Sequence, residues 1–299
     1  MSEGKFEGKS SDEGWLHLDY KDIEIGEKIG GGGVGIIYNG WFGDTPVAVK
    51  KLMDTRMDEN LKKEYLDELL VMSRLKHSNI VKFIGASLSP PDFFICMELC
   101  EVSLFSLLYK ENIVFSTYEV CQIGLDVASA MEYLHAQKPP VCHRDLKSHN
   151  ILKSYDGVFK ICDFGLVCNK NTTAGTPNYM APELLSNKSF NKSVDVYSFG
   201  ILLCEIFDGK LPFHSLSVQD IINRVLDGDR PYVPGPGAGC PERCAKLIRK
   251  CWSQSWADRP EFPDIVDELI DLTNTIPETK HSENLNTNTH DALDSLFHK

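Results

Sequence analysis

The chain reads His143-Arg144-Asp145-Leu146-Lys147-Ser148-His149-Asn150-Ile151-Leu152 in its middle, followed by Asp163-Phe164-Gly165. Together these segments supply two carboxylates, an amide and an ammonium group. In-line phosphoryl transfer needs a carboxylate that orients the attacking hydroxyl, and oxygen ligands that hold Mg²⁺ on the phosphates. Asp145, Asn150 and Asp163 fit those roles.

Apolar runs next to both segments predict how they are placed. Val141-Cys142 and Phe159 to Cys162 are each typical of a short buried strand, and Asp156-Gly157 predicts a turn between them. Loops anchored in this way can converge on one cleft. The alternative is that Asp145 and Asp163 are solvated loop acids. Either motif alone leaves that alternative open, but both in this order argue against it.

The pattern His-Arg-Asp-Leu-Lys-x-x-Asn, followed by Asp-Phe-Gly, resembles the catalytic core of a eukaryotic protein kinase. The resemblance covers roughly residues 20–273 and implies an α+β, bilobal protein kinase fold. Its N-lobe would be a small antiparallel β-sheet with one regulatory helix, and its C-lobe would be larger and mainly α-helical. The expected boundaries are a disordered leader at 1–14, a kinase domain at 15–273 (N-lobe about 15–97, hinge 98–100, C-lobe 101–273) and a polar, largely disordered tail at 274–299.

Length and composition are those of a folded globular enzyme. With 299 residues, of which 42% are apolar, the chain can bury a substantial core. A formal net charge of -12 does not favour nucleic acid or an anionic membrane surface as a partner. The longest apolar run, Phe199 to Phe207, is far shorter than the roughly 20 residues that a membrane span needs.

The ten cysteines are scattered without a Cys-x-x-Cys pair, and no signal peptide precedes them. This pattern predicts reduced thiols and a cytoplasmic location. Cys240, Cys244 and Cys251 form the only cluster, at a spacing that suits one face of a helix. A zinc site there is disfavoured because no histidine lies nearby to complete a tetrahedral set.

Gly30, Gly32 and Gly35 form a Gly-x-Gly-x-x-Gly pattern, and glycine backbone can approach phosphates closely. A dinucleotide-binding fold would need a helix directly after the glycines and an acidic residue about 20 positions on. The sequence instead continues with Ile36-Ile37-Tyr38, a turn, and Val47-Ala48-Val49-Lys50. A flexible linker is disfavoured because alternating strands bracket the glycines. The pattern therefore predicts a β-hairpin that covers phosphates.

A helix is predicted from Leu61 to Leu75, and Glu68 lies in its apolar stripe. A carboxylate there needs a cation. Lys50 is the evident partner, and the kinase resemblance gives this ion pair the task of positioning the α and β phosphates. Two alternatives are that Glu68 reaches water and that Glu64, one turn earlier, takes the role. The spacing to the kinase-like His-x-Asn-Ile segment at 77–80 favours Glu68.

Two further strands, around Val81 to Leu88 and Phe93 to Met97 with a turn at 89–92, lead to a segment that resembles the kinase gatekeeper, Met97, and hinge. The hinge backbone would bind adenine. The resemblance implies a nucleotide-binding set spread over the hairpin, the hinge and the floor of the cleft: Ile29, Gly30, Gly32, Gly35, Ile37, Ala48, Lys50, Met97, Glu98, Leu99, Cys100, Leu152 and Cys162. Cys162 should lie at the inner end of this site, either as an inert buried thiol or as a reactive one.

The second lobe is predicted to be mainly helical. Ser116 or Thr117 is the expected N-cap of a long helix before the catalytic loop. Asp195 opens an apolar helix that should be buried, and would brace the backbone of that loop. Helices are also predicted after Ser217 and from Pro241 as a first helical residue.

The resemblance also pairs Glu183 of the Ala-Pro-Glu segment with Arg259 in a partly buried, structural contact.

The resemblance implies an ATP-dependent serine/threonine protein kinase. Lys147 and Gly175-Thr176-Pro177 resemble serine/threonine specificity, and Cys251-Trp252 resembles the tyrosine-kinase-like group, of mixed-lineage or Raf type. The expected catalytic residues are Lys50, Glu68, Asp145, Lys147 and Thr176, with Asn150 and Asp163 as metal ligands. The expected cofactors are ATP and Mg²⁺ (or Mn²⁺), and the expected partners are ATP, proteins with Ser/Thr acceptors and the chain itself through autophosphorylation, without nucleic acid or a membrane span.

Three alternatives stay open: a dual-specificity kinase and, from other classes, a pseudokinase scaffold and a phosphotransferase that acts on small molecules. Against a pseudokinase, none of the catalytic and metal-binding residue types is replaced. Against a small-molecule enzyme, Thr176 and the Ala-Pro-Glu segment resemble a peptide groove.

A regulatory role is predicted for Arg144, which precedes Asp145. Its positive charge is unpaired unless an anion lies beside it. The segment between Gly165 and Gly175 contains no acidic residue, but it holds the hydroxyls of Thr172 and Thr173. A phosphothreonine there would bring about -1.5 to -2 charge to Arg144 and order the loop. The alternative is that both threonines are ordinary polar loop residues.

Overall fold

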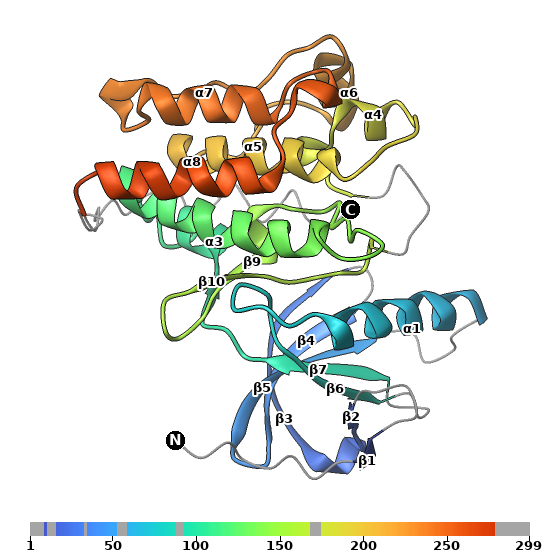
Figure 1. The fold of residues 1–299 in the computed structure, drawn as a ribbon. Coiled ribbons are helices and arrows are strands. Elements are labelled where there is room, and N and C mark those ends of the chain that lie inside the picture. Colours follow the sequence, from blue (N-terminus) through green and yellow to red (C-terminus); the bar gives the residue numbers. More distant parts are fainter. Residues whose placement is uncertain are drawn as a thin grey trace.

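The computed structural model describes residues 9–10, 16–32, 35–52, 59–87, 93–167 and 175–278. These residues form two lobes, one built around a β-sheet and one built from helices, as the sequence predicts (Figure 1).

The smaller lobe is a seven-stranded sheet. Its strands are β1 (Lys9–Ser10), β2 (Leu16–His17), β3 (Ile23–Gly32), β4 (Gly35–Phe42), β5 (Thr45–Leu52), β6 (Phe83–Ser87) and β7 (Phe94–Glu98). The spatial order is β1-β2-β6-β7-β5-β4-β3, and among the described strands of this sheet the pair β2 and β6 is parallel while the other pairs are antiparallel.

Apolar residues on β5 alternate between the two faces of this sheet. Val47 and Val49 are fully buried on the face that Leu18 covers. Ala48 belongs to the core on the other face, together with Leu69 of helix α1 (Glu59–Arg74). Both faces are therefore covered, and α1 lies directly beside the sheet (Figure 1).

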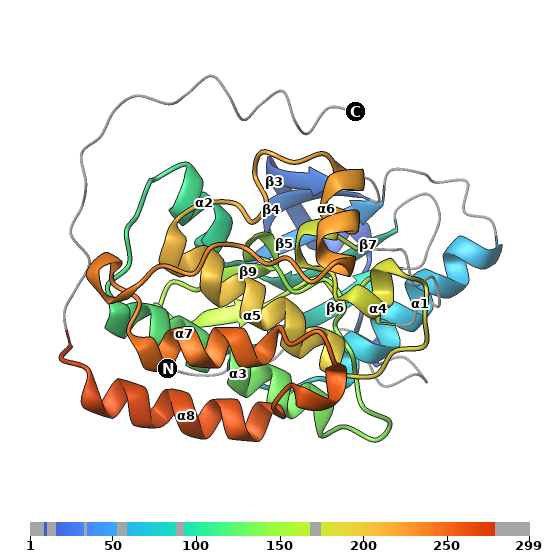
Figure 2. The ribbon, with the colours of Figure 1, turned by 90° about the horizontal axis from the view of Figure 1, so that it is seen from above.

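The larger lobe is helical. Its helices are α2 (Leu104–Tyr109), α3 (Thr117–His135), α4 (Pro182–Leu185), α5 (Ser193–Asp208), α6 (Val218–Leu226), α7 (Glu242–Cys251) and α8 (Phe262–Thr275). Helix α5 lies among α3, α7 and α8 (Figure 2). Its side chains from Val194 to Ile206 are all buried, which confirms the predicted strut. A Cβ at Gly200 would lie 2.8 Å from Cβ of Cys251, so glycine allows α7 to pack closely against α5.

Helix ends follow the predicted caps. Ser116 forms a capping box with Glu119 at the start of α3, and Ser217 accepts the backbone N–H of Asp220 at the start of α6. Helix α5 ends at Gly209, whose φ of 64° is a left-handed conformation that glycine adopts without strain.

A small three-stranded sheet places the loops of the cleft. It consists of β8 (Val102–Ser103), β9 (Ile151–Lys153) and β10 (Phe159–Ile161), in the order β10-β9-β8. Gly157, at a φ of 89°, lies in the predicted turn between β9 and β10. The catalytic loop therefore ends where β9 begins, and Asp163 is the second residue after β10.

Several local predictions are wrong. Val141 and Cys142 form no strand, because the backbone N–H of Val141 donates to Leu134 at the end of α3 instead of to a strand partner. Lys9 and Ser10, expected in a disordered leader, pair with Leu16–His17 as β1. Pro241 caps α7 rather than beginning it, because its ψ of 151° is extended. The predicted turn at 89–92 lies outside the described residues.

Candidate active site

A cavity of about 440 Å³ is lined by residues of both lobes. Most of the predicted nucleotide-binding residues line it: Ile29, Gly30, Ile37, Ala48, Lys50, Met97, Glu98, Leu99, Cys100, Leu152 and Cys162. Glu68, Asn150 and Asp163 line the same cavity. The two segments that the sequence singled out therefore meet the hairpin and the hinge in one place.

Gly32 and Gly35 do not line this cavity. They pair with each other where β3 meets β4, at the tip of the predicted hairpin. A Cβ at Gly35 would lie 2.8 Å from the carbonyl oxygen of Lys51, which no side chain tolerates without a backbone shift. Close packing of the strands is therefore one reason for glycine at that position.

Lys50 connects both lobes. Its Nζ lies 3.1 Å from Oε1 of Glu68 on α1 and 3.5 Å from Oδ1 of Asp163. This confirms the predicted contact between Lys50 and Glu68, while the side chain of the alternative, Glu64, lies outside the described residues. Asp163 itself has a φ of 65°, an uncommon left-handed conformation for a residue with a side chain.

Charge compensation keeps Lys50 and Asp163 ionised. Burial alone would lower the pKa of Lys50, but the attraction of Glu68 and Asp163 outweighs it and raises that pKa above its ordinary value. Desolvation by the walls of the cleft would likewise raise the pKa of Asp163, although its side chain is partly exposed, but Lys50 and then His143 hold that pKa below its ordinary value. The site thus presents an ammonium group beside a carboxylate that stays charged at neutral pH.

Asp145 lies at the centre of a hydrogen-bond network in the catalytic loop. Its Oδ1 accepts from the hydroxyl of Thr176 at 3.0 Å and from the backbone N–H of Thr176 at 3.2 Å. Its Oδ2 lies 2.8 Å from Nζ of Lys147 and 3.2 Å from Nδ2 of Asn150. Lys147 also donates to the Thr176 hydroxyl at 2.8 Å. The structure thus brings together four of the predicted site residues.

The backbone of this loop is held by Asp195, as predicted. Its carboxylate accepts the backbone N–H of His143 at 3.0 Å and that of Arg144 at 2.7 Å. His135, at the end of α3, lies 2.8 Å from the same carboxylate. Asp195 is fully buried, so these contacts replace water around its charge.

Arg144 contacts a carbonyl oxygen and an aromatic ring. Its Nη1 donates to the carbonyl oxygen of Leu166 at 3.1 Å, and its guanidinium lies 4.9 Å from the ring centre of Phe190. Its predicted pairing with an activation-loop phosphate stays a prediction. Thr172 and Thr173 lie outside the described residues.

Several residues that line the cavity were not predicted: Asn39, Met72, Glu101, Val102, Ser103, Ser106, His149 and Tyr155. His149 stacks on Phe105 of α2 with ring centres 3.7 Å apart. Burial, followed by the nearby charge of Lys147, lowers the pKa of His149 to about 4, so its ring is neutral at physiological pH. Ser103 as an N-cap before a leucine-rich segment was the local signal for α2.

Cys162 lies in the cavity as predicted. Burial, and then the charge of Asp163, raise the pKa of its thiol well above the ordinary value, so the reactive thiolate is scarce at neutral pH. This favours the inert reading of the two that the sequence left open.

The predicted contact between Glu183 and Arg259 is also present. Nη1 and Nη2 of Arg259 donate to the two carboxylate oxygens of Glu183 at 2.6 and 2.9 Å. Both side chains are buried, and this paired geometry is a strong form of ion pair.

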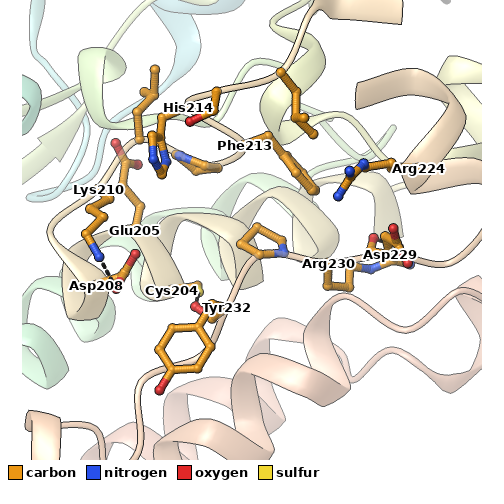
Figure 3. A pocket seen from close by; sticks show the side chains of 15 residues that line it. Cys204, Glu205, Asp208, Lys210, Phe213, His214, Arg224, Asp229, Arg230 and Tyr232 are labelled. Carbon is orange, nitrogen blue, oxygen red and sulfur yellow. Dashed lines mark hydrogen bonds and ion pairs between the residues drawn. The ribbon is translucent and has the colours of Figure 1, made fainter. Parts of the chain in front are cut away.

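A second cavity, of about 430 Å³, lies in the larger lobe between the end of α5 and α6 (Figure 3). Glu205 lines it from α5, and accepts hydrogen bonds from Tyr109 at 2.9 Å and from Ser148 of the catalytic loop at 2.7 Å. Burial raises the pKa of Glu205 to about 7, although hydrogen bonds from Ser148 and two tyrosines oppose the shift.

A two-lobed fold with this arrangement of lysine, glutamate and aspartates defines a protein kinase. The chain belongs to the family described as protein tyrosine and serine/threonine kinase, which it matches over residues 23–269.

Its relatives are named serine/threonine-protein kinases. It is 32% identical to STY46 and 36% identical to CTR1, both of Arabidopsis thaliana, over 87% and 86% of this chain. It is 35% identical to the probable kinase drkB of Dictyostelium discoideum over 84% of this chain. The chain spans 46%, 32% and 37% of the lengths of these three relatives, respectively.

In the part of the chain that the structure describes, no helix is both long and apolar enough to cross a membrane.

Proposed function

We propose that this chain transfers the γ-phosphoryl group of ATP, bound with Mg²⁺ or Mn²⁺, to serine and threonine hydroxyls of proteins. The observation that carries this proposal is the network in which Asp145, Lys147 and Thr176 contact one another at hydrogen-bond distance. Relatives named serine/threonine-protein kinases support the choice of acceptor.

Asp145 orients the acceptor hydroxyl in this proposal and receives its proton. Its two oxygens are held from opposite sides by Thr176 and Asn150, so the carboxylate is positioned before a substrate arrives. Lys147 contacts both Asp145 and Thr176, and its ammonium group can meet the charge of the transferred phosphoryl group.

Asn150 and Asp163 are the proposed metal ligands. The amide nitrogen of Asn150 donates to Asp145, which leaves its carbonyl oxygen for a cation. Asp163 offers a carboxylate whose side chain is 46% exposed. Among the described residues, no three His, Cys, Asp or Glu side chains gather as a metal site. That fits Mg²⁺, which is often held by one or two protein carboxylates together with substrate phosphates and water. When bound, the metal would neutralise charge on the phosphates.

The nucleotide would lie in the cavity of about 440 Å³. Lys50 would contact its phosphates while Glu68 holds the ammonium group in place. The hinge backbone at 98–100 would bind the adenine, next to the buried gatekeeper Met97.

A transfer assay tests the proposal. The chain is incubated with Mg²⁺, γ-labelled ATP and a generic basic protein, and labelled amino acids are identified after hydrolysis. We expect label on serine or threonine, and its loss in D145N but not in D156N, which changes a turn acid of the larger lobe. Label on tyrosine as well would indicate dual specificity. Nucleotide binding without transfer to any acceptor would indicate a pseudokinase scaffold, and label on small acceptors alone would indicate another phosphotransferase.

Phosphorylation of Thr172 or Thr173, including by the chain itself, is the proposed activating step. Arg144 supports it by its place beside Asp145. The test compares wild type with the double variant T172A/T173A after incubation with ATP. Equal activity of the two proteins would rule the step out.

We further propose a cytoplasmic location, which the nine free thiols of the described residues support.

A further inference from the structure

Two cysteines from distant parts of the sequence face each other in the larger lobe. Sγ of Cys121 on α3 lies 3.9 Å from Sγ of Cys244 on α7. The two residues are 1% and 3% exposed. Neither lines the cavity between the lobes. The sequence grouped Cys244 with Cys240 and Cys251, but its sulfur partner comes from another helix.

The beginnings of the two helices are held together at this point. Thr117, the first residue of α3, donates its hydroxyl to the carbonyl oxygen of Gly239, just before α7, at 2.7 Å. Cys121 lies about one turn further along α3, and Cys244 lies in the first turn of α7. The hydrogen bond thus keeps the sulfurs close without a covalent link.

The two sulfurs do not belong to a metal cluster of the described residues. No third histidine, cysteine or carboxylate joins the two sulfurs as a metal cluster in the described residues. A pair of thiols alone is too few ligands for a closed zinc site.

Cys244 has the surroundings of a nucleophilic thiol. It lies in the first turn of α7, where the helix dipole favours a negative charge. The hydrogen bond between the two sulfurs lowers the pKa of Cys244, and Arg243 acts in the same direction, although burial and the charge of Glu268 oppose them. The same hydrogen bond, together with burial, raises the pKa of Cys121. Cys244 is therefore the thiol that ionises first.

We propose that Cys121 and Cys244 form a disulfide when the folded protein meets a peroxide. The Cys244 thiolate attacks one peroxide oxygen, the O–O bond breaks, and the leaving hydroxide takes a proton to become water. Cys121 then attacks the sulfur of the resulting sulfenic acid, the S–O bond breaks, and the departing oxygen leaves as water with the Cys121 proton. The two thiols lose two electrons in total, and the peroxide gains them.

The bridge would connect the start of α3 to the start of α7 and close a long segment that includes the catalytic loop and α5. Closing so long a loop restricts the unfolded chain and stabilises the fold. We expect oxidation to raise the Tm by roughly 5 °C, and a thiol reductant to reverse the shift.

Peptide mapping tests the site directly. The protein is treated with hydrogen peroxide, free thiols are alkylated after denaturation, and the chain is cut with trypsin and a glutamate-specific protease. Cys121 then lies in peptide 120–132, Cys244 in 244–246, and Cys240 in a different fragment. We expect peptides 120–132 and 244–246 to be linked in the wild type and in C240S, and unlinked in C121S and C244S.

Two outcomes would overturn the proposal. One is that both thiols remain open to alkylation after peroxide treatment. The other is that Cys244 is linked to Cys240, and not to Cys121. Before oxidation, C121S should match the wild type in Tm and in nucleotide binding, which shows that it folds. After oxidation, it should lack the rise in Tm.

Discussion

Lys50 shows how much one side chain contributes to the site, because it contacts Glu68 and Asp163 at once. We expect K50M to lower kcat by roughly 100- to 1,000-fold, because it removes an electrostatic donor aimed at the phosphates. K51M is the matched control. Lys51 is the next residue of β5, and its Nζ lies 4.5 Å from the ring centre of Tyr20 instead of in the cavity. The readouts are the transfer rate and, for folding, the Tm. A K50M protein that keeps more than about a tenth of the rate would contradict the assigned role.

Glu205 is a buried acid whose pKa is raised to about 7. In the unfolded chain it titrates near its ordinary value, so between about pH 4.5 and pH 7 the folded state binds a proton that the unfolded state releases. The contribution of Glu205 to the free energy of unfolding is therefore largest below about pH 4.5. It decreases as the pH rises through this window and stays constant above it. The expected decrease in the free energy of unfolding across this window is on the order of 3 kcal/mol.

The variant E205Q isolates this contribution, since glutamine resembles the protonated acid and keeps an acceptor for Tyr109 and Ser148. Unfolding free energies are measured in urea at pH 5 and pH 8. We expect the difference in free energy of unfolding between E205Q and the wild type to shift in favour of E205Q from pH 5 to pH 8. Parallel pH profiles of the two proteins would show that Glu205 titrates normally.

Helix α3 ends at the loop that carries Asp145, so its stability bears on the site. The side chains of Ser116 and Glu119 form a capping box, in which each accepts a backbone N–H that has no partner within the first turn of the helix. We expect S116A to lower the free energy of unfolding by about 1 kcal/mol. S129A should change it by only a few tenths of a kcal/mol, because the Ser129 hydroxyl donates to the carbonyl oxygen of Leu125 in its own helix, which already lies within the helical hydrogen-bond ladder. Equal effects of the two variants would argue against the cap.

Helix α5 acts on the site through Asp195. In D195N, one carboxylate oxygen becomes an NH₂ group that faces N–H donors of the catalytic loop. We expect a loss of about 1 to 3 kcal/mol in stability, and a lower kcat with little change in KM for ATP, because Asp195 contacts the loop and not the nucleotide cavity. D208N, at the end of the same helix, is the control. A variant D195N with the wild-type kcat would show that the loop holds its shape without this brace.

The larger lobe as a whole depends on the contact between Glu183 and Arg259, which joins segments 76 residues apart. R259M would leave the Glu183 carboxylate buried without its cation, and we expect a loss of about 3 to 5 kcal/mol in stability. R249M removes an arginine whose partner, Glu242, is exposed, and should cost about 1 kcal/mol or less. Combining R259M with E183Q should recover part of the loss. If it recovers none, the effect arises from packing rather than charge.

Much of the site follows from patterns within short segments. Helical periodicity put Glu68 in the apolar stripe of α1, and the kinase resemblance paired it with Lys50. The motifs at 143–150 and 163–165 supplied the groups around Asp145. The contacts could be predicted because helix periodicity and short motifs are local properties of the sequence.

The amino-acid sequence by itself therefore determined the family, the two-lobed α+β fold, the N-caps of α3 and α6 and most residues of the nucleotide cavity. Only the tertiary structure decided that Val141 bonds to α3 instead of forming a strand, that His149 stacks on Phe105, and that Cys244 faces Cys121. It also decided the pKa of Glu205. The physical reason is that burial, stacking and sulfur contacts depend on which distant segments pack together, and local spacing carries no record of that packing.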